Sequence, residues 1–131
     1  MHVTVGQNTM DAATWVHEHY ATGTDALSVE GFVRDLADDV QMVSPAGELR
    51  GLPAVGDSAR TVFSTLSALH HEIRTVTTPS PNTIVVDATV TYWFVSGEQT
   101  SLPAVTTFQM RDGQVAHIHL EMDIAAPRRA T

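Results

Sequence analysis

SLPAVTTFQMRDGQVAHIHLEMD, residues 101–123, is the stretch that decides the fold. It contains two runs rich in β-branched and aromatic residues, 102–110 and 115–123, with the turn sequence RDGQ between them. Asp-Gly between two such runs is a strong signal for a β-hairpin, because both residues tolerate the positive φ angles of the tightest turns. We therefore predict two long antiparallel strands that pair about Asp112 and Gly113.

The returning run of this hairpin alternates between apolar and polar residues. Side chains of a strand repeat with period two, so one face carries Ile118, Leu120 and Met122, and the other carries His117, His119, Glu121 and Asp123. We expect the apolar face to be buried as the wall of a binding site. His117, His119 and Glu121 could in principle offer ligands to a metal, but an outward face needs them only to be solvated or paired, so we expect no metal site.

Composition limits the class of protein. The chain has 131 residues, no cysteine, 43% hydrophobic residues and a formal net charge of −8. We expect one domain over residues 1–131, with loose termini at 1–8 and 125–131. The acidic balance argues against a nucleic-acid partner and against an anionic membrane surface, and no run is long and apolar enough to span a membrane. No secretory signal is visible in the first residues, so we expect a cytoplasmic location.

Three helices are predicted in the first half of the chain. The first should start near Asn8 or Thr9, where Ala13, Val16, His17 and Tyr20 share one face. That face is half polar, and two interpretations stay open: His17 and Tyr20 form a solvent rim, or they belong to a pocket. The second helix should run from the cap Ser28 to 37–39, and the third from Pro53, with an apolar face that extends to Leu69.

Strands dominate the rest. We predict a short pair at 40–44 and 48–50, then long strands at 73–77 and 83–95, followed by the hairpin. His70 and His71 are interpreted as a polar cap on the third helix. This order predicts an α+β domain in which a strongly curved, mostly antiparallel sheet wraps around three N-terminal helices.

Several short motifs carry a resemblance to a known family. In chain order they are FVRDLADDV at 32–40, GLPAV at 51–55, LP at 102–103 with Phe108, DGQV at 112–115 and MD at 122–123. Together, over about residues 9–127, they resemble the SnoaL-like branch of the nuclear-transport-factor-2-like superfamily, which includes ketosteroid isomerase and polyketide cyclases. The resemblance implies a cone-shaped fold, or cystatin-like roll, with a deep pocket for a small apolar ligand, no cofactor, and a homodimer formed through the outer sheet face. Relatives include enzymes and non-catalytic binders, so the fold leaves the function open.

The catalytic positions of the relatives are mostly substituted. Alignment on the Ala-Asp-Asp motif at 37–39 places the base of ketosteroid isomerase at Ser44 and its protonated aspartate at Thr106. The aspartate that polyketide cyclases carry on the final strand falls on Leu120. Only the tyrosine of the oxyanion hole is present, as Tyr20. The resemblance therefore implies Tyr20 as a hydrogen-bond donor and supplies no catalytic carboxylate.

Two residues remain as candidate acids or bases beside Tyr20. One is His17, and the other is Asp87, which shares a strand face with Thr89, Thr91 and Trp93. The sequence leaves open which face of that strand lines the cone. The pocket that we predict contains Trp15, Tyr20, Ser44, Phe63, Trp93, Thr106, Leu120 and Met122.

Two functions follow from these residues. One is a cofactor-independent isomerase, cyclase, dehydratase or hydrolase that acts by proton transfer on a polyketide, steroid or terpenoid-like metabolite. The alternative is a non-catalytic binding protein for a small apolar ligand.

Overall fold

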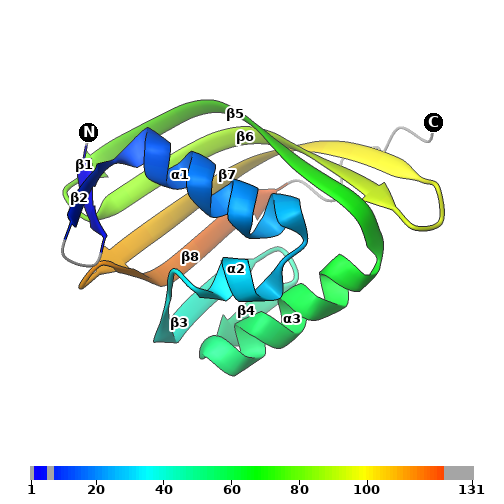
Figure 1. The fold of residues 1–131 in the computed structure, drawn as a ribbon, viewed down its shortest axis with the longest axis horizontal. Helices are drawn as coiled ribbons and strands as arrows, with labels where there is room; N and C mark the ends of the chain where they lie inside the picture. The colour runs from blue at the N-terminus through cyan, green and yellow to red at the C-terminus, as the bar shows by residue number, and fades with distance from the viewer. Residues whose placement is uncertain (1, 6–7, 123–131) are drawn as a thin grey trace.

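Six strands form one curved, open sheet that holds the helices on its concave side (Figure 1). The computed structural model describes residues 2–5 and 8–122, with side chains from residue 11 onward. The elements are β1 His2–Val5, β2 Asn8–Asp11, α1 Ala12–Thr22, a 3-10 turn η1 Thr24–Ala26, α2 Val29–Val33, β3 Leu36–Ser44, β4 Gly47–Arg50, α3 Leu52–Ser64, β5 Leu66–Ser80, β6 Thr83–Phe94, β7 Gln99–Arg111 and β8 Gln114–Met122. The predicted α+β class with a curved, mostly antiparallel sheet is confirmed.

Strand order in the large sheet is β4-β3-β8-β7-β6-β5. Every neighbouring pair is antiparallel except β3 and β8, which run parallel. A separate two-stranded sheet joins β1 to β2. Figure 1 shows α1 lying across the strands β5 to β8, with α2 and α3 together beside β3 and β4. The last described strand, β8, therefore lies in the middle of the sheet.

The predicted hairpin is present. Arg111 pairs with Gln114, so the turn has two residues, Asp112 at φ 54° and Gly113 at φ 78°. Positive φ at both positions is the signature of a type I′ turn, whose twist matches that of the flanking strands. Farther along, Gln109 pairs with His117 but Met110 pairs with Val115, so Ala116 is an extra residue in β8. This β-bulge puts Val115 and Ile118, three positions apart, on the same buried face.

The apolar face of β6 is the one that packs against the helices. Ile84, Val86, Ala88 and Val90 are all at most 2% exposed, whereas the residues between them are half-buried. Asp87, Thr89, Thr91 and Trp93 therefore lie on the outer face of the sheet, because side chains of a strand alternate. The question that the sequence left open is settled in favour of the apolar face.

The first helix begins later than we predicted. Asp11 is its N-cap, and one carboxylate oxygen accepts hydrogen bonds from the backbone N–H groups of Ala13 at 2.9 Å and Thr14 at 3.3 Å. Asn8–Asp11 is a strand instead, and it pairs with His2–Val5, where we expected a loose terminus. The predicted loose tail, 125–131, lies outside the described residues.

The buried stripe of α1 is also displaced from our prediction. Ala12, Trp15, Val16, His19 and Tyr20 are buried, and they follow the same helical spacing in another register. His17 is exposed, and Ala13 is only partly buried. This shift of the buried stripe moves His19, and not His17, into the core.

The second and third helices end earlier than we predicted. α2 stops at Val33, and Ala37, Asp38 and Asp39 belong to β3. α3 stops at Ser64, and Leu66 and Leu69 belong to β5. The register of β5 against β6 shifts between Leu66 and Ala68, so an irregular strand reproduced the three-residue spacing that we interpreted as helical. Both leucines are buried, as the pattern indicated.

Candidate functional site

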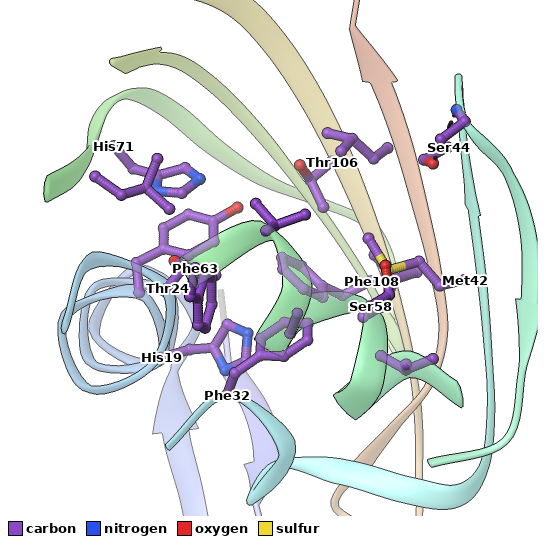
Figure 2. A pocket seen from close by; sticks show the side chains of 18 of the residues that line it. His19, Thr24, Phe32, Met42, Ser44, Ser58, Phe63, His71, Thr106 and Phe108 are labelled. Atoms are coloured by element: carbon purple, nitrogen blue, oxygen red, sulfur yellow. Dashed lines mark hydrogen bonds between the residues drawn. The ribbon is translucent and has the colours of Figure 1, made fainter. Parts of the chain in front are cut away.

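A cavity of about 240 Å³ lies between the three helices and the concave face of the sheet (Figure 2). Its walls are mainly apolar. The helices contribute Phe32, Val55, Ala59, Val62 and Phe63, and the sheet contributes Met42, Leu69, Tyr92, Phe108, Ile118 and Leu120. Its polar groups are few and come from His19, Tyr20, Thr24, Ser44, Ser58, His71 and Thr106. An apolar cavity with a few convergent polar groups is the usual form of a small-molecule site.

Part of the predicted pocket lines this cavity. Tyr20, Ser44, Phe63, Thr106 and Leu120 are in its wall. They come from α1, β3, α3, β7 and β8, so the fold brings together residues that are distant in the sequence.

The other predicted pocket residues lie elsewhere. Trp15 is 3% exposed but packs into the core, edge-on against Phe108 with ring centroids 5.3 Å apart. Trp93 is on the outer face of β6. Met122 lies beside the cavity, where its sulfur accepts a hydrogen bond from the Tyr92 hydroxyl at 3.6 Å. These three assignments are corrected because the strand faces and the helix register differ from our expectation.

The two candidate acid–base partners of Tyr20 are corrected as well. His17 is exposed on the far side of α1. Asp87 is on the outer sheet face, where Arg74 donates a hydrogen bond to its carboxylate at 2.6 Å. Neither residue lines the cavity.

Tyr20 is buried in the cavity wall, with only 5% of its surface exposed. Burial raises the pKa of its phenol well above the ordinary value of 10.0, and the nearby Asp25 carboxylate raises it further. A hydrogen bond with the Thr106 hydroxyl lowers the same pKa but only partly offsets the burial. The phenol therefore stays protonated through the neutral range and keeps a hydrogen to donate.

A histidine–aspartate pair supports Tyr20 from the sheet side. One oxygen of Asp25 is 2.6 Å from Nδ1 of His71, and the other accepts the backbone N–H of His71 at 3.0 Å. The His71 imidazole stacks on the Tyr20 ring, with centroids 3.9 Å apart and an interplanar angle of 12°. Our interpretation of His70 and His71 as a cap of α3 was wrong, because both belong to β5.

A second histidine–aspartate pair, which sequence reasoning missed, joins α1 to the segment that follows α2. Nδ1 of His19 is 2.9 Å from Oδ2 of Asp35, and the His19 side chain is 1% exposed, against 26% for Asp35. The other ring nitrogen, Nε2, is buried and has no hydrogen-bond partner among the described residues. The alternative stripe Ala12, Trp15, Val16 and His19 was visible as a helical pattern, but the partner Asp35 was not.

Close packing of α1 on α2 makes this second pair possible. A Cβ atom on Gly31 would lie 1.9 Å from the carbonyl oxygen of Thr22, so only glycine fits there. The position of Asp35 is fixed from the other side, because its backbone carbonyl accepts the N–H of Val115 in β8 at 2.8 Å. Helix contact and sheet pairing together bring the Asp35 carboxylate to His19.

Two further properties of the described residues concern metals and membranes. No three His, Asp or Glu side chains in the described ranges gather closely enough to hold a metal ion. No helix in the same part of the chain is long and apolar enough to cross a membrane.

A helix-lined cavity on the concave side of a curved, open sheet defines the class of protein. The family model of the SnoaL-like domain matches residues 16–118, and the chain belongs to this family. The match covers α1 from Val16 onward, all of α2 and α3, most of the sheet and every residue of the cavity wall except Leu120. A search of curated proteins finds no match.

Solved structures show the same fold. TerC, co-crystallized with polyporic acid, is 21% identical, with a TM-score of 0.74 over 88% of this chain and 93% of that chain. An NTF2-like protein of unknown function from Burkholderia pseudomallei is 22% identical, with a TM-score of 0.76 over 88% of this chain and 94% of that chain. An epoxide hydrolase of the LEH-like type from M. tuberculosis is 12% identical, with a TM-score of 0.73 over 87% and 84%. At these identities the likeness is one of fold.

Proposed function

We propose that the protein binds a small, ring-containing, largely apolar metabolite in this cavity and acts on it by acid–base chemistry without a cofactor. The reaction class is that of an isomerase, cyclase, dehydratase or hydrolase, and the substrate is of the polyketide, steroid or terpenoid kind. The observation that carries the proposal is a buried, protonated Tyr20 hydroxyl in a mainly apolar wall. The solved structure of TerC with polyporic acid supports a ring-containing ligand for this fold.

The chemistry that Tyr20 supplies is electrostatic. A hydroxyl that is already oriented, here by Thr106, donates a hydrogen bond to a substrate oxygen as negative charge develops on it. The surrounding apolar residues strengthen that interaction, because charge interactions grow as the local dielectric falls. The site needs no metal ion for such a step.

Non-catalytic binding is the second candidate, and one observation favours it. The family resemblance implies that Ser44, Thr106 and Leu120 stand where relatives carry carboxylates. The cavity wall contains no Asp or Glu side chain among the described residues. A protein with this wall binds a neutral ring system through apolar contact and a few hydroxyls, with no reaction. Turnover on any substrate of the proposed kind would exclude this alternative.

The test compares wild type with Tyr20→Phe and Thr106→Val. A panel of neutral ring ketones, phenols and epoxides is screened for binding and for turnover. We expect Tyr20→Phe to lower turnover about 100- to 1000-fold, the range for loss of one oxyanion donor, while folding is retained. Unchanged binding and turnover in that variant would contradict the proposal.

We also propose a cytoplasmic homodimer that forms through the outer face of the sheet. The outer positions include Val85, Trp93 and Val105, which are only half-buried in the single chain. An isologous contact would cover this face in both copies. Sedimentation near twice the chain mass of 14.2 kDa is the expected result, and a monomer at micromolar concentration would contradict it.

A further inference from the structure

The His19–Asp35 pair faces the cavity with an unsatisfied nitrogen. His19 lines the cavity, its side chain is 1% exposed, and its Nε2 has no partner among the described residues. Figure 2 shows the imidazole extending from α1 toward Phe32 and Phe108, with a nitrogen on the side of the cavity. Buried polar atoms are almost always hydrogen-bonded in folded proteins, so an unpaired one in a cavity wall indicates a contact that a ligand completes.

Asp35 determines which form the imidazole takes. An ionised carboxylate only accepts hydrogen bonds, so the nitrogen 2.9 Å from Oδ2, Nδ1, is the one that carries the hydrogen. In the neutral ring Nε2 then presents a lone pair and no hydrogen.

The surroundings hold the ring in one orientation. Trp15 stacks on it with centroids 5.0 Å apart and an interplanar angle of 5°, and Phe108 meets it edge-on at 5.5 Å. Tyr20 lies 5.8 Å away, centroid to centroid. The imidazole of His19 and the phenol of Tyr20 are therefore neighbours in the wall of one cavity.

We infer that Nε2 of His19 is the proton acceptor for the molecule bound in this cavity, and that this molecule carries a phenolic or enolic O–H or an acidic C–H beside a carbonyl. The catalytic part of this inference rests on the proposed function. In the step, the substrate O–H or C–H bond breaks and an Nε2–H bond forms. The electron pair stays on the substrate as a phenolate or enolate, whose oxygen accepts a hydrogen bond from Tyr20. The proton then returns from Nε2 to another atom of the substrate or to a leaving hydroxyl group.

His71, the other imidazole in the cavity wall, differs from His19 in its contacts and is less deeply buried, with 12% of its side chain exposed. Both oxygens of Asp25 are used by His71, and the imidazole face is covered by the Tyr20 ring. We therefore assign His71 the role of positioning Tyr20, and His19 the role of proton acceptor.

The test uses the full chain and 2-naphthol, a neutral two-ring molecule with an acidic hydroxyl. Nitrogen-15 NMR of the wild type should show His19 with hydrogen on Nδ1 and none on Nε2, and saturating 2-naphthol should shift the Nε2 signal. His19→Phe keeps an aromatic ring against Trp15 and removes the acceptor, so 2-naphthol affinity should fall at least tenfold. His17→Gln, which changes an exposed histidine on the same helix, is the matched control and should bind as the wild type does.

Each outcome has a separate meaning. A hydrogen on Nε2 in the free wild type, failure to bind 2-naphthol at millimolar concentration, or binding without a shift of the Nε2 signal would overturn the inference. If a substrate from the panel is turned over equally by wild type and His19→Phe, the inference fails and the proposed function stands. If the Nε2 signal shifts but the wild type turns over nothing in the panel, His19 remains the ligand's acceptor and only the catalytic function fails.

Discussion

The protein contains two histidine–aspartate pairs at one cavity, and they differ in how the aspartate is engaged and in how deeply the imidazole is buried. In the Asp25–His71 pair, both carboxylate oxygens are engaged by His71 and the ring is stacked against Tyr20. In the Asp35–His19 pair, one contact joins the side chains, and Nε2 of His19 is left without a partner among the described residues. The same two residue types therefore suit different tasks, one to hold a neighbouring ring and the other to exchange a proton.

The largest expected effect separates the two histidines by turnover. His19→Phe should lower kcat about 100- to 10,000-fold, the usual contribution of a positioned acid or base. His71→Gln removes the imidazole that stacks on Tyr20, and it should lower kcat far less than His19→Phe does. Steady-state kinetics on the first substrate found in the panel makes the comparison, with His17→Gln as the control. Equal losses in the two variants would erase the distinction between the pairs.

A comparison of the two aspartates gives the next effect, which is on stability. Asp25→Asn replaces one of two engaged acceptor oxygens, so it should lower the free energy of unfolding by about 1–3 kcal/mol, the cost of an unsatisfied buried group. Asp35→Asn retains a carbonyl oxygen for Nδ1 of His19 and should cost less than about 1 kcal/mol. Urea denaturation monitored by circular dichroism measures both. A larger loss of unfolding free energy in Asp35→Asn than in Asp25→Asn would contradict this assignment, because the structural pair would then be His19–Asp35.

Loss of the Tyr20 hydroxyl should have little effect on the stability of the protein, although both histidines flank this residue. Tyr20→Phe removes a hydroxyl and its bond with Thr106, so we expect a change in the free energy of unfolding of about 1 kcal/mol. Thermal melts of the variant and the wild type test this expectation. A much larger loss would make Tyr20 a structural residue and weaken its assignment as a donor.

The smallest effect concerns the titration of the same hydroxyl. Its pKa in the folded state is raised above the unfolded value, so the stability that neutral Tyr20 contributes is complete below about pH 10 and decreases as the pH rises beyond it. Absorbance titration of phenolate should show that Tyr20 ionises later than a free tyrosine, as the difference between wild type and Tyr20→Phe. Tyr92→Phe serves as the control. Ionisation of Tyr20 near pH 10 in the folded protein would show that it is open to solvent.

The sequence predicted the fold best where local chemistry decides the structure. Asp112 and Gly113 determine a turn by their backbone preferences alone. The alternation of buried and half-buried positions along β6 follows the alternation of apolar and polar residues in its sequence. The predicted helix boundaries were wrong where a cap or an irregular strand register determines the boundary, as at Asp11 for α1 and at Leu66 for β5. A spacing of three residues indicates a helix only while no bulge intervenes.

For the site, the family alignment placed Tyr20, Ser44, Thr106 and Leu120, all of which lie in the cavity wall. It had no means to find His19, since the relatives' acids and bases used for comparison are on strands and His19 is on α1. The pairing with Asp35 depends on the contact of α1 with α2 and on the hydrogen bond from Val115, which are tertiary features. Sequence periodicity cannot supply such a contact.

The central place of β8 in the sheet has a consequence for folding. β5, β6 and β7 pair with neighbours in sequence and can form as each hairpin is made, but β3 has β8 as its inner neighbour. The parallel contact from Leu36 to Val115 closes a loop that includes most of the chain, and such closures are entropically costly and slow. During synthesis, the inner edge of β3 therefore stays unpaired until β8 has emerged from the ribosome. The cavity wall is completed only at that point.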